Sequence, residues 1–167
     1  MDDSAAHGER RSRVVVVCIG NPYRRDDGVG AVVGASIRRH ALPGVDVVNC
    51  DGEATRVMES WRLCHLAVVV DAVAADGRGG QIHRFDAARK PIPVGTLRFS
   101  THGFGLNEAI ELARVVDQLP PHLIVYGVEG EDFGEGKGLS DGVASAVDEV
   151  VKRILEDIRT LKEHSHA

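Results

Sequence analysis

The sequence predicts an α/β fold, a three-layer α/β/α sandwich built around a mostly parallel five-stranded sheet. Short runs of β-branched residues alternate along the chain with segments in which apolar residues recur at helical spacing. Several of these runs are apolar throughout, which is typical of strands covered by helices on both faces. With 167 residues and 43% hydrophobic content, the chain is long enough to bury one such core.

Five segments are predicted to form the sheet. Four of them are rich in valine, isoleucine and leucine, so they are expected in its buried part. The segment Gly80–Phe85 is short and alternates between apolar and polar residues, and an edge strand is expected there. The four buried strands are predicted at Arg13–Ile19, Asp46–Cys50, His65–Val73 and His122–Val128.

Four amphipathic helices are predicted between and after these strands. In the third helix, apolar residues recur at helical spacing from Leu106 to Val116 and define one face. We find no repeat or linker, so a single domain is expected over residues 13–160, between a disordered tail at 1–12 and a polar tail at 161–167. The helices are predicted at Val29–His40, Ala54–Leu63, Gly103–Leu119 and Leu139–Lys162.

The composition argues against several functional classes. A formal net charge of −5, without a dense basic face, gives no electrostatic footprint for nucleic acid. No run approaches the ~20 apolar residues that cross a bilayer, and the first residues lack the pattern of a signal peptide. The three cysteines are few and odd in number, which favours reduced thiols in the core. We therefore expect a cytoplasmic monomer that binds neither nucleic acid nor membrane.

Two segments lack the apolar content that would dock them on the core. Asp86–Ser100 contains two prolines, and Glu129–Gly138 has the sequence EGEDFGEGKG. Both are expected to be flexible surface segments. In an open α/β sheet they would lie near the carboxyl ends of the strands, where ligands bind.

The turn after the first strand, CIGNPYRRDDGVG from Cys18 to Gly30, suggests a ligand class. A glycine-bearing turn between a strand and a helix usually holds phosphate, but a dinucleotide site needs three closely spaced glycines. Here Gly20 lacks such partners, and Asp26 and Asp27 would repel an anion. The turn therefore favours a cation over a phosphate. Either aspartate is alternatively a helix cap.

Two further polar side chains follow predicted elements at the same edge of the sheet. Asp71 lies near the end of the third buried strand, and His102 precedes the next long helix. Together with Asp27, expected in an exposed turn, they would form a metal site with open positions. The alternatives remain that Asp71 accepts hydrogen bonds from loop amides and that His102 is a cap or a packed surface residue. No Ser–His–Asp or Cys–His arrangement is evident, and Cys18, in a predicted buried strand, has no neighbouring base in the sequence.

Several short motifs, in order, resemble those of the nickel–iron hydrogenase maturation proteases. The segment GNPYRRDDGVG is similar to the signature GN-x4-D[DE]-x-x-G of that family, and the resemblance extends from Val14 to Ile158. One position departs from the family, where Cys18 replaces the usual glycine and introduces a side chain that would crowd the turn or place a thiol near the site. The other matching motifs are DG at Asp51–Gly52, VVDAV at Val69–Val73, STHGFGL at Ser100–Leu106, YGVEGE at Tyr126–Glu131 and GLSDGVASAV at Gly138–Val147.

The resemblance implies a phosphorylase/hydrolase-like fold and a metal-dependent, aspartic-type endopeptidase. Such enzymes remove the C-terminal extension from the precursor of the hydrogenase large subunit, and the nickel that they recognise is carried by that precursor. The family's metal-binding positions fall on Asp27, Asp71 and His102. Two alternatives stay open, a non-catalytic nickel-binding adaptor on the same scaffold and a Rossmann-like nucleotide-binding oxidoreductase.

Overall fold

The computed structural model of the chain describes residues 13–74, 77–93, 95, 98–99 and 105–164. They form one mixed sheet in the order β2-β1-β3-β6-β4, with β5 paired to β3 off this path. Strand β4 is antiparallel to β6, and β5 is antiparallel to β3. The parallel strands are β1 (Val14–Ile19), β2 (Val45–Cys50), β3 (Leu66–Ala74) and β6 (His122–Gly130), and the antiparallel ones are β4 (Ile82–Asp86) and β5 (Arg98–Phe99).

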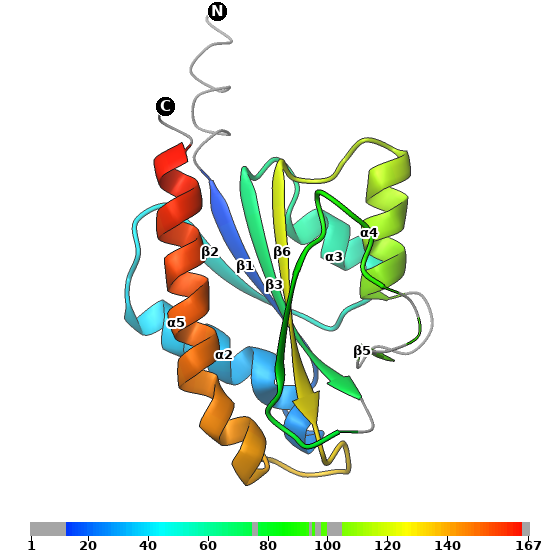
Figure 1. Cartoon of the computed structure of the whole chain (residues 1–167), viewed down its shortest axis with the longest axis vertical. Helices are drawn as coiled ribbons and strands as arrows, with labels where there is room; N and C mark the ends of the chain where they lie inside the picture. The colour runs from blue at the N-terminus through cyan, green and yellow to red at the C-terminus, as the bar shows by residue number, and fades with distance from the viewer. Residues whose placement is uncertain (1–12, 75–76, 94, 96–97, 100–104, 165–167) are drawn as a thin grey trace, which may run out of the picture.

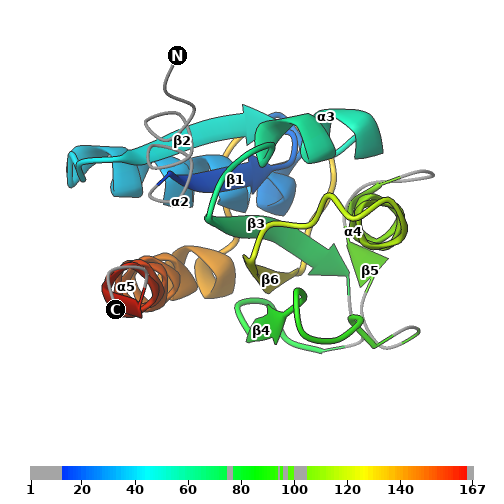
Figure 2. The same cartoon turned by 90° about the horizontal axis from the view of Figure 1, so that it is seen from above.

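Helices cover both faces of this sheet, as Figures 1 and 2 show. Helices α2 and α5 pack on one face, and α3 and α4 pack on the other. The predicted three-layer sandwich and its mostly parallel sheet are therefore confirmed, as is the edge position of β4. The helices are α2 (Val29–Arg39), α3 (Ala54–Ser60), α4 (Leu106–Val115) and α5 (Asp141–Glu163), and a short 3-10 helix, η1 (Arg25–Gly28), precedes α2.

The structure corrects some of the predicted element bounds. Helix α3 ends at Ser60 and α4 ends at Val115, each a few residues before the predicted end. Leu63 and Asp117 follow these ends with φ of 60° and 57°, a left-handed conformation that terminates a helix. The two-residue strand β5 was not predicted, because it is too short to carry a periodic signal.

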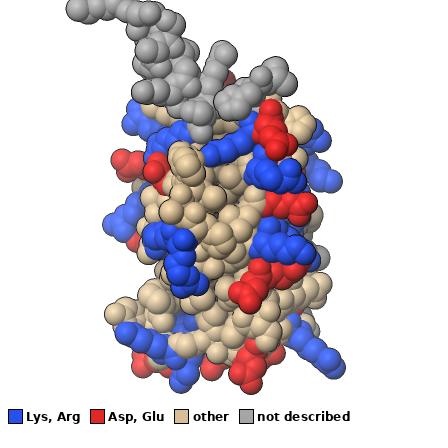
Figure 3. Space-filling model, turned by 90° about the vertical axis from the view of Figure 1, so that its left-hand side faces the viewer, with Lys and Arg blue, Asp and Glu red and all other residues tan. Residues whose placement is uncertain are grey.

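Each face of the sheet has its own hydrophobic core. Successive side chains of a strand point to opposite faces, so the even-numbered residues of β1 and β3 pack toward α2 and α5 and the odd-numbered ones toward α3 and α4. None of the helices in the described part of the chain combines the length and the hydropathy of a membrane span. On the face of the molecule shown in Figure 3, positive and negative side chains surround a largely uncharged centre.

The two segments that were expected to lack anchors are in fact docked in their described parts. In the segment Asp86–Ser100, Ala87 and Ile92 are buried in the core under α3 and α4. In the segment Glu129–Gly138, β6 continues through Gly130, and Phe133 packs on the core under α2 and α5. The expectation was wrong because a few small or isolated apolar residues suffice when backbone hydrogen bonds supply the rest.

Candidate active site at the carboxyl edge of the sheet

The turn after β1 brings two carboxylates to the carboxyl edge of the sheet. Gly20 ends the strand with φ of 135°, and a Cβ there would lie 1.9 Å from the carbonyl oxygen of Asp27. Only glycine allows this close approach. The chain then forms η1, which contains Asp26 and Asp27 and packs against β3. Neither aspartate caps α2, because the N-cap residue of that helix is Gly28.

Asp26 is fully buried and its carboxylate holds a distant segment in place. It accepts hydrogen bonds from the backbone N–H groups of Glu131, Asp132 and Ser140 at 2.7–2.9 Å, and from the Ser140 hydroxyl at 2.8 Å. Burial by itself raises the pKa of Asp26, but these hydrogen bonds outweigh it and hold the pKa below its ordinary value. Asp26 therefore anchors the loop between β6 and α5 as an ionised carboxylate.

Asp27 has a different environment, although it is adjacent. Its Oδ2 accepts a hydrogen bond from the backbone N–H of Asn21 at 2.9 Å. Its Oδ1 is buried and has no hydrogen-bond partner among the described residues. The turn is exposed at Asn21–Tyr23, as expected, but Asp27 itself is only 4% exposed, because η1 folds back over the end of β1. One oxygen of Asp27 is thus fixed and the other is available to a ligand.

Asp71 lies at the same edge. It is fully buried in β3, and the residue before it, Val70, pairs with Cys18 of β1. Since Ala67 and Val69 pack toward α3 and α4, the alternation of the strand places Asp71 on that face. His102 lies outside the described residues. In the part of the chain that the structure describes, no three side chains form a metal-binding group.

A further buried carboxylate was missed at the sequence level. Glu129 is 5% exposed, and its Oε1 lies 2.8 Å from Nε2 of His83 on β4. Its Oε2 is buried without a hydrogen-bond partner among the described residues. The sequence does contain a signal for this residue, because Glu129 directly follows the apolar run HLIVYGV. We assigned Glu129 to a loop, but it lies near the end of β6.

Cys18 takes no part in this site. The Cys18 thiol points toward α2, where its Sγ would lie 2.6 Å from a Cβ at Gly34. Burial raises the pKa of Cys18 to about 12, so the thiol is neutral. The substitution of the usual glycine by Cys18 therefore changes the packing of α2, on the face opposite Asp71. All three cysteines are free, as expected.

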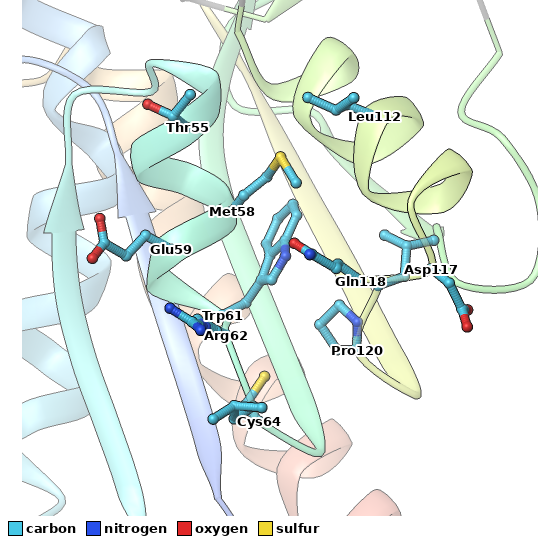
Figure 4. A pocket seen from close by; sticks show the side chains of 12 residues that line it. Thr55, Met58, Glu59, Trp61, Arg62, Cys64, Leu112, Asp117, Gln118 and Pro120 are labelled. Carbon is cyan, nitrogen blue, oxygen red and sulfur yellow. The ribbon is translucent and has the colours of Figure 1, made fainter.

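A cavity of about 750 Å³ lies between α3 and α4, far from these carboxylates. Figure 4 shows side chains that line it, among them Met58, Trp61 and Leu112. It opens next to the residues that precede β3 and β6, at the amino edge of the sheet. None of the predicted site residues lines this cavity.

Comparisons with known proteins identify the family. The sequence model of the hydrogenase maturation proteases, HycI, matches residues 31–157. The hydrogenase expression/formation protein HupD of Thiocapsa roseopersicina is 29% identical over 126 residues, which cover 72% of this chain and 57% of HupD. A putative hydrogenase maturation protease of Methanocaldococcus jannaschii is 27% identical, over 90% of this chain and 99% of the relative.

Solved structures show the same fold. The hydrogenase maturating endopeptidase HybD from E. coli superposes with a TM-score of 0.71 at 17% identity, covering 89% of this chain and 93% of HybD. HybD from Thermococcus kodakarensis, a [NiFe] hydrogenase maturation protease, gives 0.69 at 21% identity, covering 86% and 97%. The predictions of the family and of a peptide hydrolase are confirmed. Because the family model matches residues 31–157, well over half of this chain, the chain belongs to the hydrogenase maturation protease family.

Proposed function

We propose that this protein removes the C-terminal extension of a [NiFe]-hydrogenase large-subunit precursor. In this proposal the nickel is part of the substrate, carried by the precursor, and is not a resident cofactor. Asp27, Asp71 and His102 would engage it. HupD of Thiocapsa roseopersicina is longer than the region that aligns with this chain, so the substrate does not follow from that likeness alone.

The observation that carries the proposal is the state of Asp27. A buried carboxylate oxygen without a hydrogen-bond partner is costly, and such groups usually have a ligand or a functional role. Here the Oδ1 of Asp27 is in that state among the described residues, while Oδ2 is fixed by Asn21. The pairing of Val70 with Cys18, next to Asp71, supports the inclusion of Asp71 in the same site. Carboxylate oxygens with imidazole suit a divalent metal of the nickel or zinc type.

The roles of the residues follow from this arrangement. A bound nickel ion would supply a Lewis acid that polarises a carbonyl group. The chain itself orients the two carboxylates rigidly, because Asp27 is held by the Asn21 amide and Asp71 lies within the central strand. The proposal also assigns contact with the precursor to the segments Asp86–Ser100 and Glu129–Gly138. Hydrogen exchange with and without precursor tests that part, since unchanged exchange in both segments would remove it.

The direct test compares nickel-loaded and nickel-free precursor as substrates. We expect the protein to release the C-terminal peptide from the nickel-loaded form alone, as read by mass spectrometry. Equal cleavage of both forms would refute recognition through nickel. Binding of the nickel-loaded precursor without any cleavage would instead support a non-catalytic adaptor.

A further inference from the structure

The pair formed by His83 and Glu129 belongs to the same face and edge of the sheet as Asp71. Asp71 pairs with Gly127 in the register of β3 and β6, and Gly127 pairs with His83 in the register of β6 and β4. Residues paired across strands share a face. Asp71 and His83 therefore flank Gly127, a position that has no side chain.

Two apolar side chains cover Gly127 on this face and form a surface between Asp71 and His83. A Cβ at Gly127 would lie 3.1 Å from Val73 Cγ1 and 3.5 Å from Phe99 Cε1. Neighbouring strands lie about 4.8 Å apart, so about 10 Å separates the backbones of Asp71 and His83. An extended peptide rises about 3.3 Å per residue, so about three of its residues would span this distance. A peptide lying across this surface would run from the side of Asp71 to the side of His83.

Glu129 fixes the orientation and tautomer of His83. An ionised carboxylate can only accept a hydrogen bond, so Nε2 of His83 carries the hydrogen in the 2.8 Å contact. This leaves the lone pair of the neutral imidazole on Nδ1. Nδ1 has no hydrogen-bond partner among the described residues, and the side chain of His83 is 24% exposed while that of Glu129 is 7% exposed. The histidine is thus open to a ligand, and the carboxylate behind it is sealed.

A structural role alone explains this pair poorly. Replacing both partners of a buried hydrogen bond by apolar groups of the same shape is often nearly neutral or stabilising. Glu129 moreover leaves its Oε2 buried without a hydrogen bond within the described residues. Gly77 closes over that oxygen, because a Cβ at this position would lie 2.5 Å from it. The arrangement matches the way in which a carboxylate orients a histidine that moves protons during hydrolysis.

We propose that His83 is the general acid–base residue of peptide hydrolysis and that Glu129 is its positioning residue. This inference rests on the proposed function. Water adds to the scissile carbonyl carbon and gives one proton to Nδ1 of His83. The carbon–nitrogen bond then breaks, and the same proton passes to the leaving amine. No proton or electron is gained or lost overall.

The test is single-turnover cleavage of the nickel-loaded precursor, together with its equilibrium binding. We expect His83→Gln to lower the cleavage rate by about 100-fold or more, because general acid–base catalysis contributes roughly 10²–10⁴-fold. Binding of the precursor should stay within about threefold, since the metal-recognising carboxylates are unchanged. Glu129→Gln keeps the size of a side chain that is buried behind His83 and does not itself face the precursor. This variant should lower the rate in the same direction, with binding again within about threefold.

The matched control is His65→Gln. His65 also contacts another ring, that of His122 at 5.0 Å, but at the opposite edge of the sheet. This variant should cleave at the wild-type rate. In His83→Ala, added imidazole should restore part of the lost rate, which a purely structural role for His83 would not allow.

The outcomes separate the two proposals. Wild-type cleavage rates in folded His83→Gln or Glu129→Gln would overturn the acid–base role and leave the proposed function intact. A parallel loss of binding and cleavage without imidazole rescue would likewise overturn it. Failure of the wild-type protein to cleave the nickel-loaded precursor would overturn the proposed function and, with it, this inference.

Discussion

Two adjacent carboxylates in the turn after β1, Asp26 and Asp27, differ in how many hydrogen bonds they accept. On one side, Asp26 accepts four hydrogen bonds from the segment between β6 and α5. On the other side, Asp27 accepts one from Asn21 and keeps a buried oxygen without a partner among the described residues. Both side chains are buried. The difference shows that two equally buried carboxylates can differ in how far their hydrogen-bonding capacity is met, and we propose that the less satisfied one, Asp27, engages the nickel.

The largest effect is expected for Asp27→Asn. An asparagine can still accept the hydrogen bond from the Asn21 N–H, so the fold should persist, with a free energy of unfolding within about 1 kcal/mol of wild type. Loss of the charge that engages the cation should lower precursor processing by at least about a thousandfold, which corresponds to ~4 kcal/mol. Cleavage of nickel-loaded precursor measures the rate, and urea unfolding measures the stability. Near-normal processing by the folded variant would reduce Asp27 to a structural residue of the turn.

Asp26→Ala should give the opposite pattern. The substitution leaves three backbone N–H groups and the Ser140 hydroxyl without their acceptor, and unmet buried hydrogen bonds cost about 1–3 kcal/mol each. Because water will reach some of these groups, we expect a loss of about 3 kcal/mol in the free energy of unfolding. Chemical denaturation measures it, with exposed Asp148→Ala as the matched control. A loss under about 1 kcal/mol would contradict the anchoring role.

Asp26 also makes the stability of the folded protein depend on pH. The pKa of Asp26 is lower in the folded protein than its ordinary value, because the hydrogen bonds outweigh the effect of burial. Its contribution to stability is therefore fully present above the ordinary pKa of about 4 and is lost as the pH falls through the lower folded value. The loss of stability below about pH 4 should accordingly be shallower in Asp26→Ala than in wild type.

The smallest effect on stability is expected where the start of α2 packs closely against the backbone of β1. A Cβ at Gly30 would lie 2.6 Å from the carbonyl oxygen of Ile19, a backbone atom that cannot rotate away. We expect Gly30→Ala to cost about 2 kcal/mol of stability despite its better helix propensity. Gly34→Ala in the same helix is the control: its Cβ would meet the Cys18 thiol, which can rotate, so a cost below about 1 kcal/mol is expected. Equal costs at both glycines would show that the turn tolerates movement.

Much of the fold and part of the site could be predicted because they depend on local patterns. The runs of valine and isoleucine identified the strands, and the rule that parallel strands end at one edge brought Asp27 and Asp71 together. The short strand β5 and the early ends of α3 and α4 could not be predicted in this way. They depend on one or two residues whose conformation is set by their neighbours in space.

Local sequence patterns were sufficient to predict the order of the longer strands and helices, the family and the edge of the sheet at which Asp27 and Asp71 lie. The saturation of Asp26 with hydrogen bonds, the unpaired oxygen of Asp27 and the burial of Glu129 against His83 depend on the packing of distant segments. The two kinds of feature differ in the sequence separation of the residues that produce them. Periodicity is set by residues within a few positions of each other, whereas the partners of Asp26 lie 105 to 114 residues further along the chain. Such contacts exist only after the two faces of the sheet have been packed.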